Sequence, residues 1–183
     1  MSNYSYVVLM RFDEETEENI VGIRNLMLKS GYSVPEWPPH ITIAAYENIE
    51  ENLICDWTSE FASKQSGSIE VALNSLSVLP YGSQNTDSVV LCYNPAHSKP
   101  LIDFYYQFHE RHDEYCKGIG WYYSIVHGWP ILHATIGIVK VKELQKAIEI
   151  ALSCKISKPS KILALEVYAY PMELVERYEI TNT

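Results

Sequence analysis

The sequence lacks long apolar runs and closely spaced cysteines. No stretch of its 183 residues reaches the roughly 20 consecutive apolar positions that a membrane-spanning helix needs. The apolar run at residues 7–10 is too short for a signal peptide. The four cysteines are far apart, with no C-x-x-C pair, and lie at Cys55, Cys92, Cys116 and Cys154. These absences predict a cytoplasmic protein with reduced thiols and exclude a transmembrane chain.

Positive charge is also scarce. Only 14 Lys and Arg residues accompany 23 Asp and Glu residues, which gives a net charge of −9. Proteins that bind long duplexes normally present a basic surface, so we expect no long duplex partner and no membrane partner. A nucleotide or an RNA end remains compatible with this charge. No low-complexity segment is present, and a hydrophobic content of 47% is ordinary for a globular protein, so we expect one compact monomeric domain over residues 1–183.

One short pattern occurs twice in the chain. It reads WPPHITI at residues 37–43 and WPILHATI at residues 129–136. Both copies are rich in β-branched residues, which favours strands. Side chains alternate along a strand, so His40 shares a face with Thr42, and His133 shares a face with Thr135. One such pair is typical of any half-buried strand, whereas two pairs behind the same Trp-Pro lead predict a duplicated site.

The expected order of strands and helices in the first half begins with a strand. A Val- and Tyr-rich strand over residues 4–12 precedes a helix that Asp13 caps and Gly31 ends. After the first His-x-Thr strand, Asn48 begins a second helix with the spacing of a capping box. A strand over residues 69–79 follows, and a shift in its apolar phase predicts a bulge.

The second half repeats this order. A strand over residues 88–93 precedes a helix that Ser98 caps, and the apolar face of this helix is expected to extend to Tyr115. After the second His-x-Thr strand come a helix and two strands, over residues 141–151, 162–170 and 173–180. We therefore expect an α+β fold in which duplicated β-α-β-α-β units, about residues 1–80 and 88–183, form two lobes around a central cleft.

The two motifs and the repeated order resemble the signature of the 2H phosphoesterases, a superfamily that includes 2'-5' RNA ligases and 2',3'-cyclic nucleotide phosphodiesterases. The resemblance implies that each lobe contributes one His-x-Thr strand to a shared cleft. It also implies catalytic roles for His40 and His133 and phosphate binding by Thr42 and Thr135. Family behaviour assigns the base to His133 and the acid to His40, although nothing in the sequence decides between them. Ala134 is smaller than the usual family residue, which affects packing more than chemistry.

This residue set suits hydrolysis of a cyclic phosphodiester. The reaction needs a base to activate water, an acid to protonate the departing sugar oxygen, and donors to hold the phosphoryl oxygens. Imidazole has a reference pKa of about 6.5, so two histidines supply base and acid without a metal or another cofactor. We expect a metal-independent phosphoesterase that acts on a 2',3'-cyclic phosphate, or a related 2'-5' linkage, of a nucleotide or RNA end. An RNA 2'-5' ligase and a non-catalytic nucleotide-binding module remain alternatives.

Other residues are weaker candidates. Arg11 is placed to reach a phosphate or to form an ion pair, and Trp129 is a candidate substrate-binding residue at the head of the second motif. The glycine- and aromatic-rich residues 117–128 suit either a wall for base stacking or a filler between lobes. Four potential metal ligands fall close together in the sequence at His109, His112, Asp113 and Cys116. No known ligand spacing fits all four, so we expect no metal site.

Overall fold

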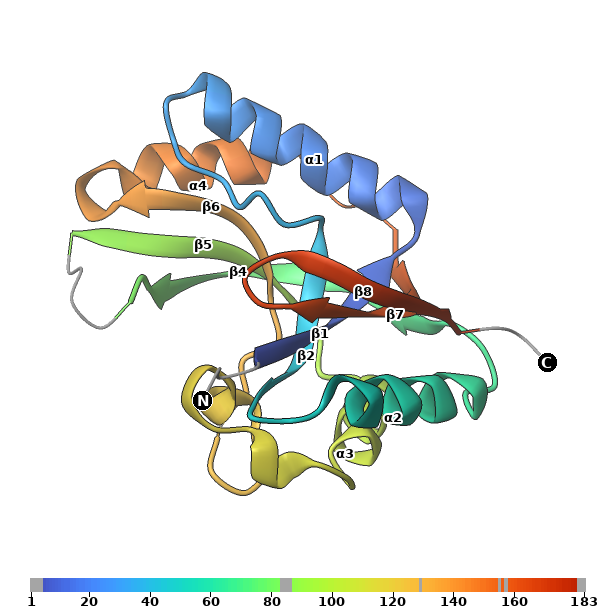
Figure 1. The fold of residues 1–183 in the computed structure, drawn as a ribbon. Coiled ribbons are helices and arrows are strands. Elements are labelled where there is room, and N and C mark those ends of the chain that lie inside the picture. Colours follow the sequence, from blue (N-terminus) through green and yellow to red (C-terminus); the bar gives the residue numbers. More distant parts are fainter. Residues whose placement is uncertain (1–4, 83–86, 129, 155, 157, 181–183) are drawn as a thin grey trace.

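The computed structural model describes residues 5–82, 87–128, 130–154, 156 and 158–180 (Figure 1). Within these ranges the chain forms eight strands, β1 (Ser5–Phe12), β2 (His40–Glu47), β3 (Ile69–Val71), β4 (Leu73–Pro80), β5 (Ser88–Pro95), β6 (Ala134–Lys140), β7 (Ser160–Ala169) and β8 (Glu173–Glu179). The α-helices are α1 (Glu14–Lys29), α2 (Glu51–Ser63), α3 (Lys99–Phe108) and α4 (Leu144–Ser153). Short 3₁₀ helices are η1 (Asp113–Tyr115), η2 (Gly118–Tyr123) and η3 (Val141–Glu143).

The strands form two antiparallel sheets. The larger sheet has the order β2-β1-β7-β3, with β8 also paired to β7, and the smaller sheet has the order β4-β5-β6. The strand with His40 and Thr42 therefore belongs to one sheet, and the strand with Thr135 belongs to the other. This arrangement confirms the expected α+β fold with two lobes.

Each sheet contains strands from both halves of the sequence. Strand β4 of the first half joins the smaller sheet, and β7 and β8 of the second half join the larger one. The chain changes sheets at Ala72, between the end of β3 at Val71 and the start of β4 at Leu73. The prediction of one continuous strand over residues 69–79 is therefore wrong, because its two parts belong to different sheets. The irregularity that the apolar phase predicted is confirmed, because the register of β4 against β5 shifts between Leu73 and Ser75.

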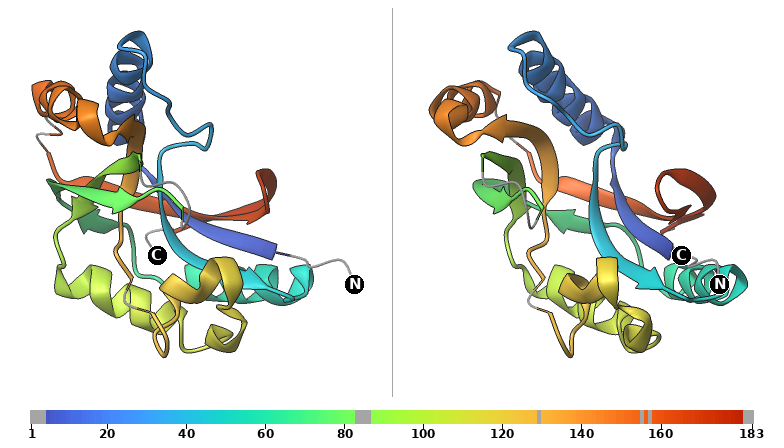
Figure 2. Two further views of the ribbon diagram at one scale, coloured as in Figure 1. Left: turned by 90° about the vertical axis from the view of Figure 1, so that its left-hand side faces the viewer. Right: turned by 60° about the vertical axis from the view of Figure 1, so that its left-hand side comes forward.

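Helices cover the outer faces of both sheets. Helices α1 and α4 lie side by side against β6, while α2 packs on β7 and β8 and α3 packs on β3 (Figures 1 and 2). Two predicted caps are confirmed: Asp13 accepts from the Thr16 amide at 3.0 Å, and Ser98 accepts from the Leu101 amide at 3.4 Å. Among the described residues, no helix is long and apolar enough to cross a membrane.

Two local predictions fail at helix ends. Asn48 does not cap α2, because it has a positive φ of 60° and the N-cap is Glu50, which makes no side-chain capping bond. Helix α3 ends at Phe108 instead of extending to Tyr115. His112 beyond it has a φ of 65°, in the left-handed region, so the apolar spacing continues through a turn and not through a helix.

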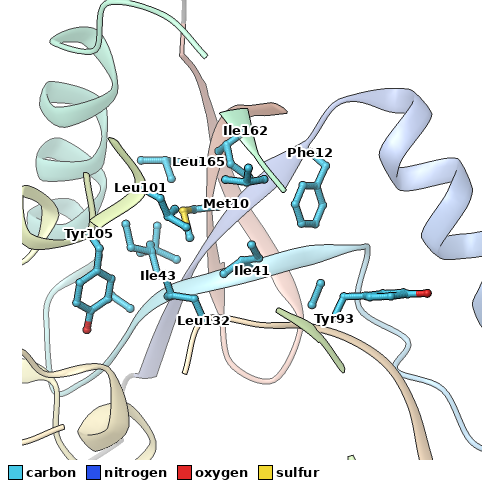
Figure 3. Close-up of a cluster of buried hydrophobic side chains, with 14 of the residues drawn as sticks. Met10, Phe12, Ile41, Ile43, Tyr93, Leu101, Tyr105, Leu132, Ile162 and Leu165 are labelled. Atoms are coloured by element: carbon cyan, nitrogen blue, oxygen red, sulfur yellow. The ribbon is translucent and has the colours of Figure 1, made fainter. Parts of the chain in front are cut away.

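The main core lies where the larger sheet meets α3 and the chain before β6. Figure 3 shows buried side chains of β1, β2 and β7 that point toward those of α3 and Leu132. Met10, Ile41, Ile43 and Leu165 are fully buried there. This core packs against one face of β1 and β2 and holds the two strands side by side. The polar groups of these strands lie on the opposite face.

Candidate active site

The two motif histidines have the same local geometry. His40 is the first residue of β2, and His133 directly precedes β6. Nδ1 of His40 lies 2.6 Å from the carbonyl oxygen of Pro38, and Nδ1 of His133 lies 2.5 Å from that of Ile131. A carbonyl oxygen only accepts, so Nδ1 carries the hydrogen in both rings. In the neutral ring, Nε2 of each histidine is therefore the basic atom that is left for proton exchange.

A buried arginine joins the two motif segments. Arg24 of α1 is 5% exposed. Its Nη1 donates to the carbonyl of Trp37 at 2.6 Å, while Nε and Nη2 donate to the carbonyl of Thr135 at 3.1 and 2.7 Å. The Ile138 amide of β6 also donates to the Ser33 carbonyl at 2.8 Å. The first motif therefore lies beside the second, as the sequence led us to expect.

The surroundings of the two imidazoles favour their neutral forms. Burial and, to a smaller extent, the charges of Arg24, His133 and Arg11 lower the pKa of His40 to about 4, against the bond to the Pro38 carbonyl. Burial also lowers the pKa of His133, against its bond to the Ile131 carbonyl.

The two threonines lie on the faces that carry the histidines. Thr42 and Thr135 are half-buried. Burial raises the pKa of the Tyr123 phenol, and a hydrogen bond with the Thr42 hydroxyl opposes this shift. The Thr135 hydroxyl lies 3.8 Å from the sulfur of Cys92. Burial raises the pKa of that thiol to about 12, so Cys92 is a neutral neighbour and no nucleophile at pH 7.

A small apolar cluster lies beside these polar groups. It consists of Val7, Leu9, Ala45 and Tyr168, with Trp37 and Tyr123 packed against it. The Trp37 ring lies 5.2 Å from that of Tyr168 and 5.9 Å from the His40 imidazole, measured between centroids. The Trp-Pro lead of the first motif therefore places an aromatic wall next to its histidine.

A pocket of about 580 Å³ opens beside His133. It is bounded by the end of β4 on one side and by η2 on the other, and is lined by Leu79, Pro80, Gly82, Tyr122, Tyr123, Ile131 and His133. Tyr122 is 68% exposed, so its ring faces solvent at the margin. The expected aromatic wall in residues 117–128 thus contributes two tyrosines to a pocket that contains a motif histidine.

Asp113 holds the segment that carries Tyr123. Its carboxylate lies 3.0 Å from Nδ1 of His109, and it accepts from the Ser124 hydroxyl at 2.7 Å and the Ile125 amide at 2.9 Å. Nε2 of His109 in turn lies 2.9 Å from the carbonyl of Ile43 on β2. This network anchors the aromatic segment to the motif strand.

The same network accounts for the potential metal ligands. Donor atoms of His109, Asp113 and Cys116 lie within 4.8 Å of one another. His112 does not belong to this group. Its ring packs against Trp57 instead, with 6.3 Å between the ring centroids. The ring nitrogens of His109 and the carboxylate oxygens of Asp113 already have protein hydrogen-bond partners, so the contacts are explained without a metal ion.

Two further residues were candidates from the sequence. Arg11, which pairs across β1 and β2 with His40, is only 9% exposed. Its guanidinium donates to Glu17 at 2.9 and 2.8 Å and also to Glu166, so the structure shows the ion-pair alternative, in a buried form. The other residue, Trp129, lies outside the described residues.

Sequence reasoning missed Arg24 and did not single out Tyr123. Arg24 directly follows the apolar residue Ile23 and lies one turn after Ile20, on the face of α1 that is buried. A charged residue on such a face is unusual, since arginine is rarely fully buried without partners, and this was the available signal. Tyr123 lay within an aromatic run whose local conformation the sequence did not define.

Comparisons with known proteins support the architecture. No protein-family model and no curated protein matches the chain by sequence. Among solved structures, Usb1 of Kluyveromyces marxianus with uridine monophosphate is 10% identical, with a TM-score of 0.54 over 97% of this chain and 98% of that one. LigT of E. coli complexed with NADP+ is 11% identical, with a TM-score of 0.55 over 98% and 99%. A structure described as a phosphoesterase is 12% identical, with a TM-score of 0.55 over 97% and 99%.

These similarities cover nearly the whole of each chain, and at such low identity they establish the fold. The protein shares the two-lobed α+β fold of these structures, so the fold that the motifs and the strand order led us to expect is confirmed.

We predict that Gly120→Ala detaches η2 from β2. A Cβ at Gly120 would lie 1.7 Å from the carbonyl oxygen of Ala45, so the backbone itself has to move. Urea unfolding should show a loss of about 1–3 kcal/mol, as for other overpacked sites. The matched control is Gly22→Ala in α1, where a Cβ meets nothing within 4 Å and should stabilise the helix by about 0.5–1 kcal/mol. Equal effects of the two substitutions would contradict this packing.

Proposed function

We propose that this protein is a metal-independent phosphoesterase of the 2H type, which hydrolyses a 2',3'-cyclic phosphate or a related 2'-5' linkage at a nucleotide or RNA end. The observation that carries the proposal is the pair of imidazoles, each held through Nδ1 by a carbonyl and tied together by Arg24. Solved relatives of the fold contain uridine monophosphate in Usb1, and 3'-AMP or phosphate in LigT. These ligands support a nucleotide phosphate as the substrate class.

The reaction needs one proton transfer on each side of the phosphorus. Water attacks phosphorus while Nε2 of one histidine takes its proton, and the bond from phosphorus to one ribose oxygen breaks. Nε2 of the other histidine, protonated beforehand, gives its proton to that oxygen. The hydroxyls of Thr42 and Thr135 donate to the non-bridging oxygens as charge develops. No oxidant, metal or further reactant is required.

We assign the base to His40 and the acid to His133. The positive charges of Arg24 and Arg11 are among the causes that lower the pKa of His40, whereas burial lowers the pKa of His133 against its carbonyl bond to Ile131. The phosphate's negative charge would then favour a proton on His133. This order is the reverse of that implied by the family resemblance.

The rest of the substrate would occupy the pocket beside His133. Its tyrosines can stack on a base, and its aliphatic walls suit a ribose edge. None of the described residues that line it is a lysine or arginine. Together with the net charge of −9, this favours a mononucleotide or a short RNA end over a long chain. We further propose a monomer in a reducing cytoplasm, in keeping with four free cysteines.

Substitution of either histidine tests the proposal. His40→Ala and His133→Ala should each lower kcat/KM for a 2',3'-cyclic nucleotide by about 10²- to 10⁴-fold, the usual worth of a positioned acid or base. The double variant should be little worse, because the two groups act in one step. His97→Ala, at an exposed histidine before α3, is the control. A parent protein that binds the nucleotide without turnover is a binding module, and one that only joins RNA ends is a ligase.

The assignment of roles has its own test. A 2'-deoxynucleoside 3'-(p-nitrophenyl phosphate) has no 2'-hydroxyl to attack phosphorus, so water is the nucleophile, and it releases p-nitrophenolate, which leaves without protonation. On this substrate His133→Ala should retain most of the parent rate, because the acid is dispensable, while His40→Ala should stay impaired by about 10²-fold or more. The opposite pattern would assign the base to His133.

Chelation tests the absence of a catalytic metal. Base, acid and phosphate donors are all side chains, so we predict that turnover survives prolonged incubation with EDTA. The rate before and after chelation is the measurement, with metal content checked by mass spectrometry. Loss of turnover that zinc or manganese restores would contradict the mechanism and direct attention to His109, Asp113 and Cys116.

A further inference from the structure

We propose that Arg24 is a positioning residue of this site, which fixes the spacing of the two His-x-Thr segments and places an uncompensated positive charge behind His40. The inference deepens the proposed function and rests on it for the activity readouts. It assigns two separable tasks to one guanidinium. Neither task requires contact between Arg24 and the substrate.

The mechanical task follows from the hydrogen bonds. Arg24 comes from α1, yet its guanidinium donates to carbonyls on both sides of the site, at Trp37 before β2 and at Thr135 within β6. A guanidinium is rigid and planar, so the two carbonyls are held at a distance set by its shape. An ammonium at the same place is smaller and lacks this fork. Lysine therefore preserves the charge but not the bridge.

The electrostatic task follows from the pairing of charges. Among the described residues, no carboxylate lies within ion-pair distance of Arg24, and burial lowers its pKa to about 10 against the charge of Glu17. The other cation near His40, Arg11, is balanced by Glu17 and Glu166. Of the two arginines that act on His40, Arg24 is thus the one without a neutralising partner.

The charged and titratable groups that act on His40 come from three parts of the chain. Arg24 approaches from α1, Arg11 from β1 with its two carboxylates, and His133 from the chain before β6. The Trp37 ring, whose centroid lies 5.9 Å from that of the His40 imidazole, carries no charge. Removal of the Arg24 charge should therefore raise the pKa of His40, because the balanced Arg11 does not replace it.

Two substitutions separate the tasks. Arg24→Gln removes the charge and should raise the pKa of His40, followed by NMR of the ring protons, by about 0.5 to 2 pH units for a charge at this range in a partly buried site. Arg24→Lys keeps the charge and should leave that pKa near its parent value. The lysine variant should instead lose kcat by about 10- to 10²-fold with little change in KM, because misplacement of reacting groups slows the chemical step.

The matched control is Arg111→Gln, since Arg111 is an exposed arginine paired with Glu60. It should leave the His40 titration and kcat unchanged. An unchanged His40 pKa in Arg24→Gln, or full kcat in Arg24→Lys, would overturn the proposal. If Arg24→Gln does not fold, Arg24→Lys alone decides, through its kcat and its His40 titration. The titration needs no substrate, so a parent protein that turns over no cyclic phosphate refutes the proposed function while the pKa result still judges Arg24.

Discussion

The hydrogen bond from each imidazole Nδ1 to the carbonyl two residues earlier is the contact on which the candidate site depends. It occurs at Pro38 for His40 and at Ile131 for His133, although the residues between carbonyl and histidine differ. Each bond fixes the tautomer and the ring orientation at once, so the two imidazoles present the same atom, Nε2, for proton exchange. A flexible imidazole would lose this advantage, because a general acid or base must lie within hydrogen-bond reach of the proton it moves.

The architecture around these bonds resists separation of the two lobes. Strand β4 from the first half of the sequence lies in the smaller sheet, and strand β7 from the second half lies in the larger sheet. Arg24 bridges the two motif segments through the carbonyls of Trp37 and Thr135. Burial of an unpaired guanidinium costs stability, and hydrogen bonds to carbonyls offset only part of that cost. A protein selected for stability alone would place an apolar residue there. A charged group is retained at such a place where it serves the function and the protein tolerates the loss of stability.

Much of this arrangement was predictable, for local reasons. The His-x-Thr pairs, the Asp13 and Ser98 caps and the alternation of strands and helices depend on neighbouring residues, and the structure has all of them. The change of sheet at Ala72 was not predictable, because apolar phase reports which face is buried and not which sheet the strand joins. The roles of Arg24 and Tyr123 were not predicted for a related reason: their partners, Thr135 and Thr42, are distant in sequence.

The central claim is that His40 and His133 act as a pair on one phosphate. Titration of the protein with inorganic phosphate, followed through the NMR signals of the histidine ring protons, tests it most directly. The account predicts that both rings respond along a single one-to-one binding curve and that the pKa values of both rise, since a bound anion stabilises the imidazolium form. The ring of the exposed His97 should not respond. A response of only one motif histidine, or two unrelated binding curves, would contradict the account.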